Sequence, residues 1–149
     1  MSVTLMIEEE KWRTKRGLGA RLKQAAALAL THGGNADGKI TILLADDSRL
    51  RALNVSFRGK DKATNVLAFP ARHEGYLGDV AIAYGTTAKE AKAQNKSFAD
   101  HAIHLAVHGV LHLLGYDHET ARAAHAMEPL EASILGELGI DDPYARKAA

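Results

Sequence analysis

The stretch from His108 to His118, HGVLHLLGYDH, restricts the fold and chemistry of this chain more than any other. His108 and His112 are four residues apart in an apolar run, so on a helix both imidazoles project from the same face. Gly115 is the residue type that ends a helix in a left-handed conformation, after which the chain can turn back and present His118. Two imidazoles one turn apart can share a cation at zinc–nitrogen distances of about 2.0–2.1 Å. The spacing therefore predicts a helix that ends in a metal site.

Histidine is the ligand type that this chain concentrates in one place. Five of the eight histidines lie within residues 101–118, and the absence of cysteine excludes disulfides and thiolate metal sites. Three histidines leave the fourth position of a tetrahedral zinc ion open to water, which is the arrangement of a catalytic site. We therefore predict one Zn²⁺ ion, or another divalent metal, on His108, His112 and His118.

The neighbouring histidines are assigned other roles. His104 lies one turn before His108 on the same helical face, where it can support the ligands, contact the substrate or replace a ligand. Of these roles, support of the ligands or packing is favoured. His101 and His125 are expected to face solvent.

The same spacing matches His-x-x-x-His-x-x-Gly-x-x-His, the frame of the metzincin metalloproteases, and Met127 is a candidate for their methionine turn. In those proteases a glutamate directly follows the first histidine and acts as the general base. Here Gly109 occupies that position, and glycine cannot transfer a proton. The sequence therefore argues against a protease of this type. The nearest carboxylates, Asp117 and Glu119, flank His118 and can orient it or its water.

The rest of the chain predicts a single α+β domain spanning residues 1–149, with a small mixed four-stranded sheet packed by about five helices. Short β-branched and apolar runs between turn signals predict strands at residues 2–7, 40–46, 65–69 and 77–83. Apolar residues at helical spacing predict helices at residues 18–30, 47–57, 87–94, 97–114 and 120–138.

Local signals refine these boundaries. Asp47 or Ser48 can cap the second helix, which places Leu50, Leu53 and Phe57 on one apolar face. Two further caps are expected at Thr87-x-x-Glu90 and, in a looser form, at Ser97-x-x-Asp100. Prolines are expected to close the third strand at Pro70 and to interrupt or kink the last helix near Pro129.

The first residues and the hydropathy of the chain bear on its location. No apolar run approaches the roughly 20 residues that span a membrane. The N-terminus lacks a basic region followed by an apolar one, so we expect no signal peptide. A cytoplasmic protein without a membrane partner is the resulting expectation.

Residues 58–62, RGKDK, place three cations in a turn just before a predicted strand. The planar guanidinium of Arg58 can bind a phosphate through two hydrogen bonds and stays charged. Lys60 and Lys62 add charge beside it. Taken alone the segment also fits a charged surface turn, and a formal net charge of +1 gives no overall basic signature for nucleic acid.

Taken together, three segments resemble the YbeY family of bacterial endoribonucleases. They are FRGKDKATNVLAFP at 57–70, LGDVAI at 77–82 and HGVLHLLGYDH at 108–118. The resemblance covers most of residues 40–145, including MEPLEASILGELGI and the Asp-Pro-Tyr at 142–144. One departure is Ala63, where many relatives have proline; it loosens the turn without removing a chemical group.

The resemblance implies a cytoplasmic, metal-dependent endoribonuclease specific for single strands, acting in ribosomal RNA maturation and ribosome quality control. It implies zinc or a related divalent ion on His108, His112 and His118, and a functionally important arginine at Arg58. Lys60 and Lys62 are then expected to guide the RNA strand. The implied partners are single-stranded ribosomal RNA and the small ribosomal subunit or its assembly factors.

Two other functions remain open from the sequence. The protein can be a ribosome-assembly factor whose zinc only holds the end of the helix, which the modest net charge favours. It can also be a metal-dependent hydrolase of small molecules or peptides, including a metzincin-like protease without the general-base glutamate. Metal-free protein separates the first from a nuclease: an assembly factor should still bind ribosomal particles if it stays folded, and a nuclease should lose cleavage.

Overall fold

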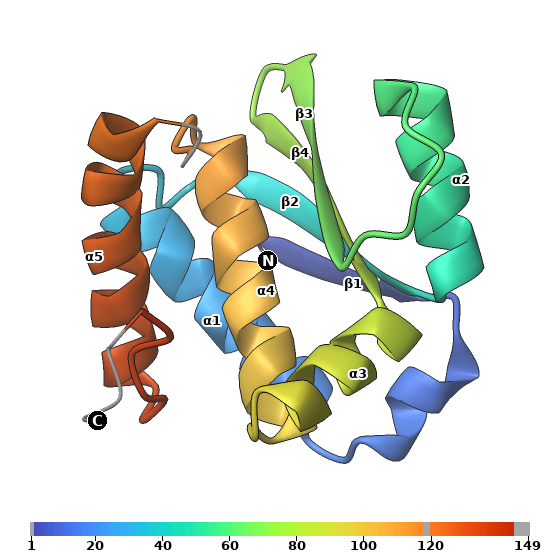
Figure 1. Ribbon diagram of the computed structural model, residues 1–149. Coiled ribbons are helices and arrows are strands. Elements are labelled where there is room, and N and C mark those ends of the chain that lie inside the picture. Colours follow the sequence, from blue (N-terminus) through green and yellow to red (C-terminus); the bar gives the residue numbers. More distant parts are fainter. Residues whose placement is uncertain (1, 118–119, 145–149) are drawn as a thin grey trace.

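The computed structural model describes residues 2–117 and 120–144, in which five α-helices and one 3-10 helix pack around a four-stranded sheet (Figure 1). The strands are β1 (Val3–Ile7), β2 (Lys39–Ala45), β3 (Val66–His73) and β4 (Tyr76–Ala83). The helices are η1 (Glu10–Thr14), α1 (Leu18–His32), α2 (Asp47–Arg58), α3 (Tyr84–Ala93), α4 (Phe98–Leu113) and α5 (Ala121–Glu137). The predicted α+β fold with a small mixed sheet and about five helices is confirmed.

The sheet has the strand order β1-β2-β4-β3. β1 and β2 are parallel, β2 and β4 are parallel, and β3 returns antiparallel to β4 as a hairpin. β3 is thus an edge strand, which tolerates a proline because only one side of it needs backbone donors. Pro70 pairs with Gly78 and β3 continues to His73, so the prediction that Pro70 closes this strand is wrong.

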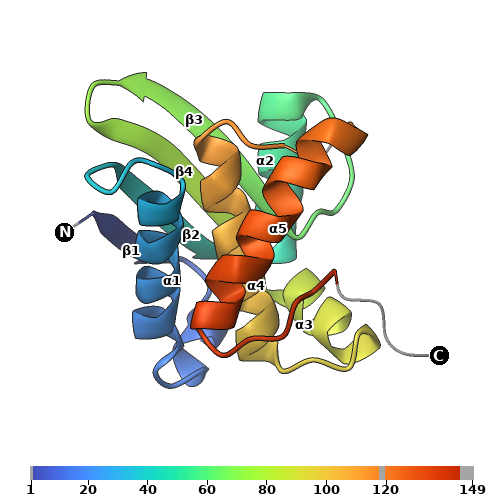
Figure 2. The ribbon, with the colours of Figure 1, turned by 90° about the vertical axis from the view of Figure 1, so that its left-hand side faces the viewer.

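Strand side chains alternate between two apolar layers, as the two-residue period of a pleated strand requires. On β2, Ile40, Ile42 and Leu44 are buried in the larger core with α1, α4 and α5. Ala45 belongs to a smaller cluster that includes Leu50 of α2. Helix α2 therefore covers one face of the sheet, α1 and α4 cover the other, and α5 packs against α1 and α4 (Figures 1 and 2).

Helix α4 occupies the centre of the larger layer, and the position of Gly109 explains how closely it approaches the sheet. A Cβ atom at Gly109 would lie 2.5 Å from Cγ1 of Val80 and 3.3 Å from Cγ2 of Val66. A side chain at this position would therefore collide with strands β3 and β4. The residue that would be the protease glutamate is here a packing glycine.

Helix α3 begins earlier than its sequence predicts. It starts at Tyr84 directly after β4, and its N-cap Ala83 provides no side-chain hydrogen bond. The Tyr84 ring packs edge-on against the Trp12 ring, with 5.4 Å between the centroids, so the first residue of the helix is held in the core. Thr87 donates its hydroxyl to the carbonyl of Ala83, 2.6 Å away, so the predicted Thr87-x-x-Glu90 capping box is wrong.

Helix α2 also differs in detail from its prediction. Its N-cap is Asp46, whose carboxylate accepts from the backbone N–H of Arg49 at 2.8 Å. The Asp47 carboxylate instead accepts from the N–H of Thr86, which ties α2 to the start of α3. Phe57, predicted on one apolar face with Leu50 and Leu53, is 68% exposed, and its ring centroid lies 5.0 Å from that of Phe69.

Helix α5 runs without interruption from Ala121 to Glu137 with Pro129 inside it, so the predicted interruption does not occur. It lies against α4 and α1 in the turned view of Figure 2. Met127 is fully buried within this helix, which leaves no methionine turn at that position. Among the described helices, none is both long and apolar enough to cross a membrane.

Candidate metal centre

Helix α4 carries the site, and its two ends follow from the sequence. At the start, the Ser97 hydroxyl accepts from the N–H of Asp100 at 3.0 Å, as predicted from the looser cap. At the end, Gly115 has a φ of +98°, a region that favours glycine. The N–H of Tyr116 then bonds back to the carbonyl of Leu111 at 3.0 Å. The helix therefore ends at Leu113, directly after His112, and the chain turns back at Gly115.

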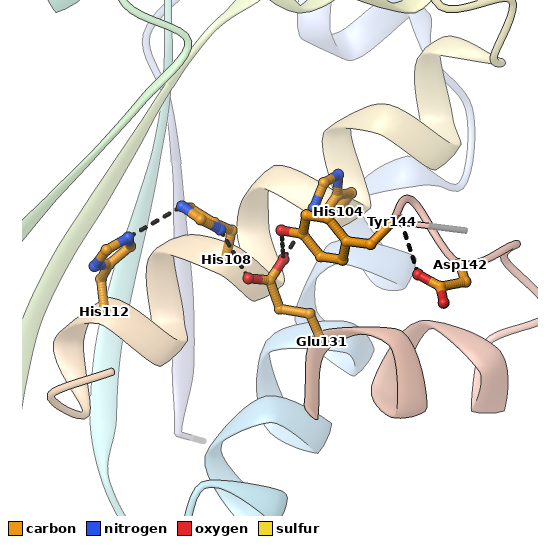
Figure 3. A network of polar contacts seen from close by, with 6 residues as sticks. All are labelled: His104, His108, His112, Glu131, Asp142 and Tyr144. Atoms are coloured by element: carbon orange, nitrogen blue, oxygen red, sulfur yellow. Dashed lines mark hydrogen bonds and ion pairs between the residues drawn. The ribbon is translucent and has the colours of Figure 1, made fainter. Parts of the chain in front are cut away.

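The histidine pair has the geometry that a shared cation needs. Nε2 of His108 and Nε2 of His112 lie 3.0 Å apart, and both side chains are only partly buried (Figure 3). Two ligands at zinc–nitrogen distances of about 2.0–2.1 Å are about 3.3 Å apart in a tetrahedral site. The two nitrogens thus need to separate by only a few tenths of an ångström to hold zinc.

Behind the pair lies a carboxylate that the sequence interpretation missed. Glu131 of α5 is fully buried, and its Oε1 is 3.0 Å from Nδ1 of His108. Its Oε2 is 2.9 Å from Nε2 of His104 and accepts from the Tyr144 hydroxyl, also at 2.9 Å (Figure 3). In the sequence, Glu131 lies at helical spacing between the apolar Met127 and Ile134. A charged residue on an apolar helical face indicates that it is buried and paired with another polar group.

The charges of this network follow from the same contacts. Burial by itself raises the pKa of Glu131, but the hydrogen bonds from His104 and His108 outweigh burial and hold this pKa at about 2. Burial and the negative charge of Glu131 raise the pKa of Tyr144 well above its usual range. At neutral pH, Glu131 is therefore an ionised acceptor and Tyr144 a protonated donor.

The described residues contain one group of three candidate ligands, His104, His108 and Glu131, whose ligand atoms lie within 4.8 Å of one another. This group can hold a metal ion. Its three members are already joined at hydrogen-bond distances of 2.9 and 3.0 Å, however. A metal there would have to displace the protons of both contacts, whereas between His108 and His112 it would displace only the one proton shared by the two Nε2 atoms.

The third predicted ligand, His118, and its neighbour Glu119 lie outside the described residues. Asp117 is described and lines the same cavity as the histidine pair. The chain therefore reaches the cavity one residue before His118. The assignment of His118 as a ligand stays a prediction.

A groove of about 860 Å³ runs over the histidines and brings the two halves of the sequence together. Arg58, the last residue of α2, lines this groove together with His104, His108 and His112. Its other walls come from β3, the end of α3, and the segment after α5, and include Val66, Leu67, Ala68, Pro70, Gln94, Lys96, Pro143 and Tyr144. Lys60 and Lys62 lie in the exposed loop after α2 and are not among the described residues that line the groove.

One end of the groove holds a second buried histidine network. His101 is only 3% exposed, so the prediction that it faces solvent is wrong. Its Nε2 lies 2.8 Å from Oε1 of Glu90, which also accepts from the Asn65 side chain at 2.9 Å. Burial lowers the pKa of His101, against the opposing effect of Glu90. His125, by contrast, is exposed as predicted.

The sequence model of one family, described as "Endoribonuclease YbeY", matches residues 6–139, which include Arg58 and both helices of the glutamate network. The chain belongs to the YbeY family. This confirms the resemblance seen in the RGKDK and histidine segments.

Related YbeY proteins are similar over nearly the whole chain. A protein named endoribonuclease YbeY from Rhodopseudomonas palustris strain BisA53 is 45% identical, with 95% of this chain and 88% of that protein covered. One of the same name from Chelativorans is 48% identical over 87% of this chain and 83% of that protein. The solution structure of TM1509 from Thermotoga maritima has a TM-score of 0.62 at 25% identity, covering 97% and 99% of the two chains.

Proposed function

We propose that this YbeY protein is a zinc-dependent, single-strand-specific endoribonuclease that acts in ribosomal RNA maturation and ribosome quality control. The observation that carries the proposal is that Arg58 and the pair His108 and His112 line one groove. A phosphodiester needs an activated water and a positive charge on its oxygens, and the groove offers residues for both. The names of the relatives support RNA as the substrate.

The metal ligands in this proposal are His108, His112 and His118. Their donor set suits zinc or another divalent ion that binds imidazole nitrogen. When bound, such an ion lowers the pKa of its coordinated water towards about 7 and polarises a phosphoryl oxygen. The facing Nε2 atoms, 3.0 Å apart, support this assignment.

Arg58 binds the scissile phosphate and stabilises the charge that its oxygens gain in the transition state. Its exposed side chain at the end of α2 can reach a strand lying in the groove. Lys60 and Lys62 guide the RNA from outside the groove, and His104 contributes from its floor. We place the reaction in the cytoplasm, with ribosomal RNA and the small subunit or its assembly factors as partners.

Substitution of Arg58 tests this function. Removal of one charge-stabilising donor costs about 10²–10³ in rate, so Arg58→Ala should cleave a single-stranded RNA oligonucleotide at least a hundredfold more slowly. The variant should keep the thermal stability and bound metal of the wild type. Arg49→Ala is the matched control, because it removes the same charge from α2 at a position outside the groove. An Arg58→Ala protein that cleaves as fast as Arg49→Ala contradicts the proposal.

The assembly-factor function makes a different prediction for metal-free protein. If zinc only held the end of α4, chelated and folded protein would bind ribosomal particles, and any cleavage would be incidental. The proposal requires that chelation abolishes cleavage and that added zinc restores it. Analysis of the product ends also identifies the nucleophile, because a cyclic phosphate shows attack by the ribose 2′-hydroxyl rather than by water.

A further inference from the structure

We propose that Glu131 is the positioning residue of the metal centre: it holds the proton of His108 on Nδ1 and thereby presents Nε2 of His108, with its lone pair, to the metal. This inference deepens the proposed metal site and rests on it. It concerns the chain's own hydrogen bonds, which can be tested without RNA.

Glu131 is surrounded by hydrogen-bond donors. The carboxylate is fully buried and accepts contacts of 2.9–3.0 Å from His104, His108 and Tyr144. An ionised carboxylate has no hydrogen to donate, so each of these partners must supply one. A buried carboxylate with three donors is strongly held, since each lost donor leaves a desolvated oxygen.

The second step follows from the two nitrogens of a neutral imidazole, of which only one carries hydrogen. The contact to Glu131 assigns the hydrogen of His108 to Nδ1, so Nε2 of His108 carries the lone pair. That atom is the one that faces Nε2 of His112 at 3.0 Å. Metal-binding histidines commonly donate their second N–H to a carboxylate in this way, which fixes the ring and increases its basicity.

His104 is fixed by the same carboxylate in the opposite sense. Its Nε2 carries the hydrogen that Glu131 accepts, and its buried Nδ1 has no hydrogen-bond partner within the described part of the chain. Nε2 of His104 is therefore occupied by the hydrogen bond to Glu131. Glu131 thus makes His108 a ligand and His104 a support.

Tyr144 brings the end of the chain into this arrangement. Asp142 accepts from the backbone N–H of Tyr144 at 2.8 Å, and the Tyr144 ring packs edge-on against His104, 6.0 Å between centroids (Figure 3). The hydroxyl is one of two donors to Oε2, whereas Oε1 accepts from His108 within the described part of the chain. Loss of the Tyr144 hydroxyl alone should therefore leave the His108 tautomer unchanged.

The histidine tautomers of the metal-free wild type give the first test. In long-range ¹H–¹⁵N spectra of protein labelled on histidine, His108 should carry its proton on Nδ1 and His104 on Nε2. This measurement needs no substitution, so it decides the inference even if a Glu131 variant does not fold. A wild-type His108 protonated on Nε2 with a bare Nδ1 overturns it.

Glu131→Gln gives the second test, because glutamine has only one acceptor oxygen. The amide oxygen should take the position of Oε2, where it accepts from both His104 and Tyr144. The amide N–H₂ then faces Nδ1 of His108, so the proton of His108 must move to Nε2. Zinc binding, measured by competition with a chromophoric chelator, should weaken about 10–100-fold. Glu128→Gln, one turn earlier on α5, is the matched control and should bind zinc as the wild type does, as should Tyr144→Phe within about threefold.

Three results contradict the inference. The first is that Glu131→Gln binds zinc as tightly as Glu128→Gln does. The second is that Tyr144→Phe weakens zinc binding as much as Glu131→Gln does. The third is that X-ray absorption of the zinc-loaded wild type shows a carboxylate oxygen bound to zinc that is lost in Glu131→Gln, which would make Glu131 a ligand. None of these outcomes depends on RNA cleavage, so they are separate from the Arg58→Ala result.

Discussion

At the scale of single residues, the difference between this site and a metzincin is a matter of packing as well as chemistry. Gly109 stands where those proteases have their general base, and the strands leave no room for a side chain there. The carboxylate of this centre comes instead from Glu131, on a different helix. Glu131 contacts Nδ1 of His108, a predicted ligand, whereas the metzincin glutamate acts on the metal-bound water.

Gly109→Ala tests the packing of α4 on the sheet. Alanine normally stabilises a helix by about 0.5–1 kcal/mol relative to glycine. At Gly109 the added methyl meets Val80 at 2.5 Å, and overpacking of this kind costs about 1–3 kcal/mol. Denaturant unfolding should therefore show a net loss of stability for Gly109→Ala. Gly136→Ala on α5, where nothing lies within 4 Å, is the control and should be neutral or stabilised.

Individual residues also mark the limit of prediction from the sequence. The spacing of His108 and His112 and the glycine stop at Gly115 were sufficient to predict their geometry, because these relations are local to one helix. The burial of His101 and the role of Glu131 were not predicted. Both depend on which helices pack against α4, and no local pattern gives that information.

At the scale of elements, α4 is anchored at two points by carboxylates from neighbouring helices. Glu90 of α3 contacts His101 near its start, and Glu131 of α5 contacts His104 and His108 further along. The existence and order of the strands and α-helices were predictable from periodicity. The start of α3 was not: the helix begins at Tyr84, whose ring packs against the distant Trp12, and no local pattern gives such a contact.

The His101 anchor predicts a dependence of stability on pH in the metal-free protein. Burial lowers the pKa of His101 in the folded state, below the value of about 6.5 in an unfolded chain. Its contribution to stability is therefore fully present above pH 6.5 and is lost as the pH falls below that value. Chemical unfolding between pH 7.5 and 5.5 should show a steeper loss for the wild type than for His101→Gln, which can still donate to Glu90.

His125→Gln is the control for this comparison, because His125 is exposed on α5 and lies outside both networks. Its stability profile should follow that of the wild type over the same pH range. If His101→Gln also has the wild-type slope, His101 does not contribute to acid sensitivity in the way its burial indicates.

At the scale of the whole molecule, the groove joins segments that are far apart in the sequence. Arg58 lies at the end of α2, the histidines lie on α4, and Tyr144 is the last residue of the described chain. The sequence predicted Arg58 and the histidine pair as site residues, but not the contacts of Glu131 and Glu90, and the packing of the elements decides that these groups meet. β3 is the edge strand and packs against α4, so residues of both elements line one groove.

The most direct test of the account combines metal content and cleavage in one pair of proteins. Elemental analysis of purified wild-type protein should find about one zinc or other divalent ion per chain, and the protein should cleave single-stranded RNA. His112→Ala should remain folded and lose both the metal and the cleavage. A wild-type protein without metal or cleavage, or a His112→Ala protein that cleaves at the wild-type rate, would contradict the central claim.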